Sequence, residues 1–153
     1  MTDILDEIIA HKRLEIEQQK AAISQELLIN NCNEPMPRRS MRASLSASPS
    51  GIIAEFKRRS PSKGWIKENA QADIISPAYE MAGASVLSIL TDENFFGGNL
   101  KDIRAARPQV SLPILRKDFI IDEYQLYQAC IVGADAVLLI AAALRKEQCS
   151  MLA

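Results

Sequence analysis

The sequence predicts an α/β fold in which strands and helices alternate along most of the chain. After residue 51, short apolar runs are separated by segments whose apolar residues recur at helical spacing. The runs are 52–56, 85–90, 112–115 and 136–140, and the helical segments lie near 71–82, 100–106 and 122–131. This alternation is typical of right-handed crossover units on a parallel sheet. Two nearly identical phrases, AGASVLSIL and VGADAVLLI, indicate that the βα unit is repeated.

The first third of the chain has a different pattern, and we assign 1–50 to a helical extension with a linker and 51–153 to the α/β unit. Apolar residues in 3–20 follow the spacing of an amphipathic helix, and a second apolar group at 23–29 extends or follows it. The stretch that follows is rich in Asn, Pro, Ser and Arg, which is typical of a connection. We expect one helical turn within it, around 38–45.

Three residues are expected to mark helix boundaries in the α/β unit. Gly83 and Gly133 each precede a strand and are well placed to end a helix in the left-handed conformation. Pro77 lies within a helical segment, where a proline in the interior costs about 3 kcal/mol. The spacing therefore predicts a short helix with Ser76 as its N-cap and Pro77 at the first helical position.

Composition narrows the class of protein. The 153 residues suffice for one domain with a core, and 48% hydrophobic with 24% charged residues is ordinary for a globular protein. The formal net charge of −1, without an aromatic and basic stripe, argues against nucleic-acid binding. No apolar run approaches the ~20 residues of a membrane helix, and the acidic start MTDILDEII does not resemble a signal peptide.

Histidine and cysteine usage excludes several kinds of site. The single histidine, His11, rules out an all-His metal centre and lies in a charged helical segment, where we expect it to be solvated. The three cysteines, Cys32, Cys130 and Cys149, are widely spaced and odd in number, so they suggest neither a disulfide framework nor a zinc site. We therefore expect a reducing compartment and a cytoplasmic location.

Charged residues at two strand ends are the strongest functional signal. Because alternate residues of a strand share a face, Glu55 and Lys57 point the same way at the end of the first strand. Lys117 ends the third strand, and the carboxyl ends of parallel strands are where α/β proteins bind ligands. A single Glu–Lys pair is equally well explained by an ion pair at the sheet rim, whereas two such strand ends favour a site. A lysine cluster suits proton donation, a Schiff base or an anionic substrate.

The loops after these strands add candidates without deciding between them. SPSKG lacks the NTPase P-loop pattern and no G-x-G-x-x-G follows a strand, so ATP and dinucleotides are poor candidates. Ser60 and Lys63 suit a small anion, although a plain turn explains them as well. Phe95 and Phe96 either pack in the core or flank a planar ligand. The residues alone predict an anion-binding α/β enzyme with a lysine-rich site.

Four motifs in order, IIAEFKRRSPSKG, SVLSILTDENFFGG, PILRKDFIID and GADAVLLI, resemble indole-3-glycerol phosphate synthases. The resemblance covers almost all of 1–144 and is most specific in E-x-K-x-x-S-P-S and R-K-D-F-I. It implies a (βα)8 TIM barrel, of which about the first four βα units are present, with an N-terminal helical extension over the catalytic face. The implied activity is that of a carbon–carbon lyase (a carboxy-lyase) of tryptophan biosynthesis, which needs no metal or organic cofactor.

The resemblance also implies a reaction and roles for residues. The substrate, 1-(2-carboxyphenylamino)-1-deoxyribulose 5-phosphate, closes its ring with loss of CO2 and water. Lys117 would be the general acid, Glu55 would orient it, and Lys57 would engage anionic groups of the substrate and donate a proton in the dehydration. The implied substrate contacts are Ser60, Phe96, Phe119 and Leu138.

The length departs from the family pattern, since a full barrel needs about 250 residues. We therefore expect an N-terminal piece of a synthase that binds a small phosphorylated substrate and no nucleic acid or membrane. Alone, it is expected to self-associate through exposed half-barrel edges or to be inactive. Two alternatives stay open from the sequence: a Schiff-base lyase or aldolase that uses Lys117, and a non-catalytic half-barrel that pairs with a partner.

Overall fold

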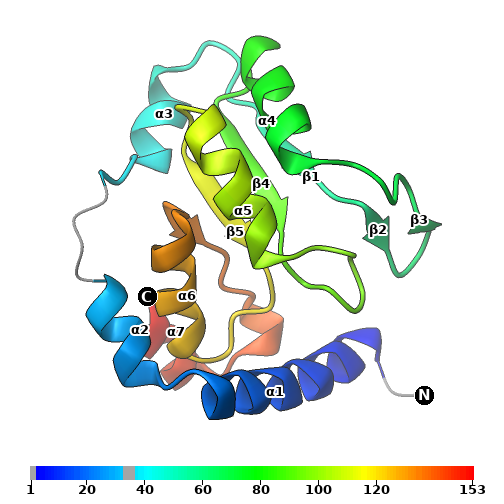
Figure 1. Ribbon diagram of the computed structural model, residues 1–153, viewed down its shortest axis with the longest axis vertical. Coiled ribbons are helices and arrows are strands. Elements are labelled where there is room, and N and C mark those ends of the chain that lie inside the picture. Colours follow the sequence, from blue (N-terminus) through cyan, green and yellow to red (C-terminus); the bar gives the residue numbers. More distant parts are fainter. Residues whose placement is uncertain (1–2, 33–36) are drawn as a thin grey trace.

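A four-stranded parallel sheet organises the chain in the computed structural model, which describes residues 3–32 and 37–153 (Figure 1). The strand order β1-β4-β5-β6 follows the sequence, and helices α4, α5 and α6 make the three connections. The strands are β1 (Ile53–Phe56), β4 (Val86–Leu90), β5 (Ile114–Lys117) and β6 (Ala136–Val137); the helices are α4 (Ala72–Met81), α5 (Leu100–Ala106) and α6 (Tyr124–Val132). The predicted crossover units on a parallel sheet are thus confirmed.

The core lies between the sheet and these helices. Alternate strand residues, such as Phe56, Leu87, Ile89 and Ile114, point to the helical side and are almost fully buried. The helices contribute small and branched residues to the same cluster, among them Ile103. Because the period of a strand is two, the charged residues Glu55 and Lys57 are thereby placed on the opposite face of the sheet.

Two strands differ from their predicted bounds. The third strand was expected at 112–115 but runs over Ile114–Lys117, because Pro113 has no N–H and only its carbonyl joins the ladder, accepting from the backbone N–H of Leu87. The fourth was expected at 136–140 but ends at Val137. In the described chain β6 pairs only with β5, and in their register the last residue of β5, Lys117, faces Leu138, so Leu139 and Ile140 have no partner on β5.

The helix boundary predicted at Pro77 is wrong. Helix α4 begins five residues earlier, after Gln71, and carries Pro77 in its interior. Its buried face packs Ala72, Ile75 and Tyr79 on the core, and this packing outweighs the cost of the proline. The predicted glycine conformations are confirmed, since Gly83 and Gly133 have φ angles of 93° and 89°.

Several elements have no signal in the hydrophobic pattern. The SPSKG segment forms the turn of a small antiparallel hairpin, β2 (Arg59–Ser60) with β3 (Gly64–Trp65). Two 3-10 turns, η1 (Arg107–Gln109) and η2 (Ala141–Ala143), and a last helix, α7 (Lys146–Leu152), complete this part of the chain. The hairpin matters for function because it lies directly after the charged end of β1.

The N-terminal region forms α1 (Ile4–Ala22), α2 (Gln25–Cys32) and α3 (Met41–Ala47), close to the helices expected there. Figure 1 shows α1 lying across the end of the sheet that β4 points to, with α2 beside α6. Helix α1 and α2 are held on α6 by a second apolar cluster of Ile16, Leu28 and Tyr124. No helix in 3–32 or 37–153 is long and apolar enough to cross a bilayer.

The expectation that the cysteines form no disulfide is wrong. Cys32 at the end of α2 and Cys130 in α6 are joined by a disulfide, with Cα atoms 5.9 Å apart, and Cys149 is free. The pair is separated by 98 positions, so the sequence shows no recognisable spacing. The packing of α2 on α6 brings the two together. The inference of a reducing compartment from cysteine usage therefore loses its basis.

Candidate active site

One carboxylate joins two lysines at the carboxyl ends of β1 and β5. Oε1 of Glu55 lies 3.2 Å from Nζ of Lys57, and Oε2 of Glu55 lies 3.0 Å from Nζ of Lys117. About a third of each side chain is exposed. The three charged groups therefore converge on one face of the sheet, as their strand positions predict.

Neighbouring groups fix the charge and orientation of Glu55. Ser88, opposite Glu55 in β4, donates a hydrogen bond of 3.4 Å to Oε2. Burial alone would raise the pKa of Glu55, but hydrogen bonds from Lys117 and Lys57 outweigh it, so this pKa lies below its usual value. Glu55 is thus an anion between two cations. Ser88 was missed because a serine inside an apolar run carries no pattern of its own.

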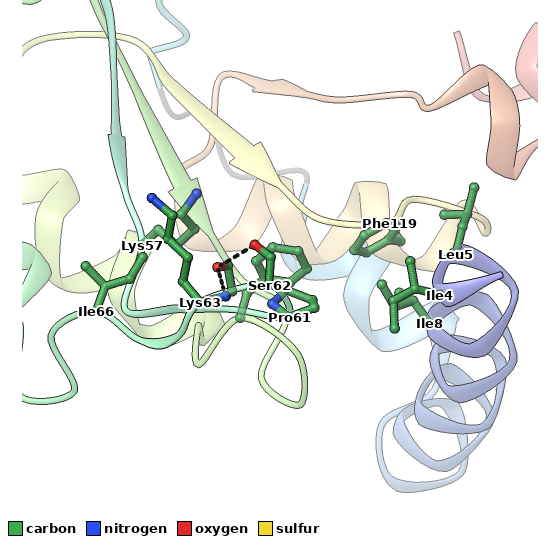
Figure 2. A pocket seen from close by; sticks show the side chains of 11 residues that line it. Ile4, Leu5, Ile8, Lys57, Pro61, Ser62, Lys63, Ile66 and Phe119 are labelled. Carbon is green, nitrogen blue, oxygen red and sulfur yellow. Dashed lines mark hydrogen bonds between the residues drawn. The ribbon is translucent and has the colours of Figure 1, made fainter.

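A cavity of about 550 Å³ opens beside this cluster (Figure 2). Lys57 lines it and links it to Glu55 and Lys117, which do not themselves line it. Its walls come from α1, the loop after β1, and the loops after β4 and β5; the lining residues are Ile4, Leu5, Ile8, Lys57, Ser60, Pro61, Ser62, Lys63, Ile66, Phe96 and Phe119. Lys57 and Lys63 point the same way in Figure 2. The cavity thus has apolar walls and a positively charged side.

Of the four predicted substrate contacts, three line this cavity and one does not. The rings of Phe96 and Phe119 lie side by side, with centroids 6.0 Å apart and planes tilted by 38°. Ser60 is buried, and its Oγ accepts a hydrogen bond from the backbone N–H of Lys63. Leu138 follows the end of β6, is half-buried, and does not line the cavity.

Two other sequence candidates have a structural explanation. Phe95 packs edge-on against His11, with ring centroids 5.7 Å apart, so it joins the loop to α1 rather than lining the cavity. The His11 side chain is 43% exposed, so it is only partly solvated. The contribution of α1 to the cavity walls, through Ile4, Leu5 and Ile8, could not be read from the amphipathic pattern.

The arrangement suits a planar, negatively charged ligand. Two phenylalanine rings and aliphatic side chains offer contact to an aromatic group, while the ammonium groups of Lys57 and Lys63 offer charge to carboxylate or phosphate. Lys117 is a proton donor that Glu55 holds in place. Within the described ranges, no group of three or more His, Cys, Asp or Glu side chains is arranged to hold a metal ion.

Comparisons with known proteins point to one family. Residues 5–153 match the model of the family described as indole-3-glycerol phosphate synthase. A relative from Bacteroides thetaiotaomicron with that name is 69% identical over 153 residues. Relatives from Neisseria meningitidis serogroup B and Syntrophobacter fumaroxidans, also named indole-3-glycerol phosphate synthase, are 51% and 44% identical over 152 and 151 residues.

The alignments cover these chains unequally. They include 100% of this chain and 59% of the Bacteroides protein. For the Neisseria protein the shares are 97% and 58%, and for the Syntrophobacter protein 96% and 57%. The chain therefore spans a little under three fifths of the length of these relatives.

Proposed function

The chain belongs to the indole-3-glycerol phosphate synthase family, and we propose that its cavity serves the ring closure of 1-(2-carboxyphenylamino)-1-deoxyribulose 5-phosphate. Its four parallel strands, with the helices that connect them, belong to the βα units of the family's (βα)8 barrel. The proposed product is indole-3-glycerol phosphate, and the reaction releases CO2 and water. The observation that carries the proposal is the Lys57–Glu55–Lys117 cluster beside an apolar, positively charged cavity.

The cavity matches the two ends of this substrate. The anthranilate ring is flat and apolar, and the rings of Phe96 and Phe119 are proposed as its walls. Its carboxylate and the phosphate are anions, for which Lys57 and Lys63 provide charge. Ser60 is a proposed polar contact at the same loop.

The reaction steps can be assigned to the side chains of the cluster that exchange protons with the substrate. A ring carbon attacks the carbonyl carbon of the ribulose chain, and Lys117 donates a proton to the carbonyl oxygen as the new C–C bond forms. Loss of CO2 restores the electron pair to the ring. The hydroxyl then leaves as water, with Lys57 donating the second proton. Lys117, now neutral, takes a proton from the neighbouring CH2 group as the C=C bond of the indole forms. Glu55 orients Lys117 and balances the charge of both lysines.

A chimera tests this function without depending on the activity of the 153-residue chain. The chain replaces the matching part of the Bacteroides thetaiotaomicron relative, and the rest of that relative is left unchanged. We expect the purified chimera to convert the substrate to indole-3-glycerol phosphate, detected by indole fluorescence. A folded chimera that forms no product, beside an active parent, would refute the proposal.

Self-association and a cytoplasmic location are part of the proposal. Strands β1 and β6 are the edges of the described sheet, and the exposed Ile52 and Ile53 lie at the first of them. Unpaired strand edges favour association. We expect oligomers of the 153-residue chain by size-exclusion chromatography with light scattering; a monodisperse monomer contradicts this. We propose a cytoplasmic location from the biosynthetic role of the family, and recovery of the expressed protein outside the cytoplasmic fraction contradicts it.

A further inference from the structure

Lys12 is a charged residue on the buried side of α1. It lies four positions after Ile8 and four before Ile16, which are both buried, and it is itself 0% exposed. A lysine at such a position is rare unless its ammonium group is paired. The contacts of this ammonium group therefore identify what Lys12 does.

Three carboxylates surround the ammonium group. Nζ of Lys12 donates a hydrogen bond of 2.8 Å to Glu15, and it lies 2.9 Å from Asp92 and 3.1 Å from Asp118. Burial alone would lower the pKa of Lys12, but Asp118, Asp92 and Glu15 outweigh it and raise this pKa. Lys12 is therefore a buried cation that ties α1 to residues of the barrel.

The two aspartates stand at the strand ends that carry the site. Asp118 directly follows Lys117, and its Oδ1 also accepts from the backbone N–H of Phe119 at 2.8 Å. Asp92 lies two residues after the end of β4, and its Oδ1 accepts from the backbone N–H of Phe95 at 2.8 Å. Lys12 thus holds the two loops from which Phe96 and Phe119 reach the cavity.

The two aspartates depend on Lys12 to different degrees. Asp118 keeps a second cation, because Arg116 lies 2.9 Å from its Oδ2, and Thr91 donates to the same oxygen at 2.6 Å. Oδ2 of Asp92 is buried, and within the described chain its one polar contact is the Lys12 ammonium group at 2.9 Å, which supplies its compensating charge. Removing Lys12 would leave this carboxylate uncompensated.

We propose that Lys12 is a positioning residue for the active site: its ion pairs with Asp92 and Asp118 fix the ends of β4 and β5, and so set where Lys117 meets Glu55. The role of Lys117 as the general acid rests on the proposed function, whereas the effect of Lys12 on the position of the Lys117 side chain does not. The network would make α1 part of the catalytic geometry as well as a wall of the cavity.

The test uses the 153-residue chain labelled with 13C at the ε carbons of lysine. The Lys117 cross-peak is assigned from Lys117→Arg. Lys12→Met keeps the length of the side chain and removes its charge. The matched control is Lys20→Met, which removes another ion pair between α1 and the loop after β5, at 2.7 Å from Asp122 but about one third exposed.

We expect Lys12→Met to displace the Lys117 cross-peak and to speed hydrogen exchange in 91–98 and 117–121, while Lys20→Met changes neither. The double variant Lys12→Met/Asp92→Asn also removes the negative charge of Asp92, so it serves as the test if Lys12→Met alone does not fold. In this double variant the Lys117 cross-peak should remain displaced, because the ion pair between Lys12 and Asp118 is still missing. A wild-type Lys117 peak and wild-type exchange in the folded variants would overturn the proposal. Absence of turnover would count against the proposed function and would leave this result intact.

Discussion

Glu55 on β1 accepts a hydrogen bond from Lys117 on β5, at 3.0 Å and across 62 positions of sequence. Strand β4 lies between these two strands, and its Ser88 donates to the same carboxylate oxygen. The other oxygen holds Lys57. Glu55 therefore sets the relative positions of both proposed proton donors, and its charge is central to the site.

Glu55→Gln tests this role of the charge. Glutamine keeps the shape of the side chain but cannot balance two cations, so Lys57 and Lys117 should separate. In the chimera we expect kcat to fall by about 10- to 100-fold, because small displacements of catalytic groups reduce rates by up to about this factor. Glu68→Gln, at an exposed position, is the control and should leave kcat unchanged. Equal kcat values for the two variants would contradict the role.

Asp118 should contribute stability that acid removes. Burial alone would raise the pKa of Asp118, but Arg116, Lys12 and Thr91 lower it from 3.8 to about 2. A carboxylate whose pKa is lowered by folding stabilises the protein above its unfolded pKa, and this contribution is lost as pH falls from 3.8 to about 2. The shift corresponds to about 2 kcal/mol.

The measurement is urea unfolding at several pH values. Asp118→Asn should show a shallower loss of unfolding free energy between pH 3.8 and about 2 than the parent chain. Asp73→Asn, at an exposed position, serves as the control and should follow the parent. Parallel curves for Asp118→Asn and the parent would contradict the assigned pKa.

The Cys32–Cys130 disulfide should stabilise the chain under oxidising conditions. It closes a loop of 98 positions, and cross-links of long loops stabilise proteins by about 2–4 kcal/mol. A reductant should lower the free energy of unfolding by this amount, and thiol titration of the oxidised chain should find Cys149 alone. Cys32→Ser/Cys130→Ser should not respond to reductant. Three titratable thiols under oxidising conditions would show that the bond does not form.

Gly98 should tolerate no side chain. A Cβ atom there would collide with the backbone carbonyl of Leu90 and the N–H of Thr91, while the Gly98 N–H donates to the carbonyl of Asp92 at 2.8 Å. Because the obstacle is backbone, Gly98→Ala should cost about 3 kcal/mol in urea unfolding. Gly51→Ala has free space but a φ of 59°, and should cost about 1 kcal/mol. A smaller cost at Gly98 than at Gly51 would contradict the close approach.

The sequence predicts the strands and crossover helices well because burial imposes a period on apolar residues. It fails where local pattern and tertiary packing disagree. Pro77 stays inside α4 because the helix packs on the sheet. The hairpin of β2 and β3 has two residues per strand, too few for any periodicity. The disulfide joins residues that only the packing of α2 on α6 brings together.

The site was predictable to the extent that strand geometry determines it. Alternation along β1 was enough to place Glu55 and Lys57 on one face, whereas the register between β1, β4 and β5, which puts Lys117 on the same face, comes from the structure. The role of α1 was not predictable, since an amphipathic pattern shows a buried face without its partner. Lys12 did leave a signal, because it is a charge on the stripe formed by Ile8 and Ile16.

The kcat of the chimera with Lys117→Met tests the central claim most directly. General acids contribute about 10²- to 10⁴-fold to rates, so we expect a loss in this range. Lys101→Met, on the exposed side of α5, should retain the kcat of the parent chimera. If Lys117→Met kept kcat within about tenfold of the parent, a range too small for a lost general acid, the cluster at the ends of β1 and β5 would not be the catalytic centre.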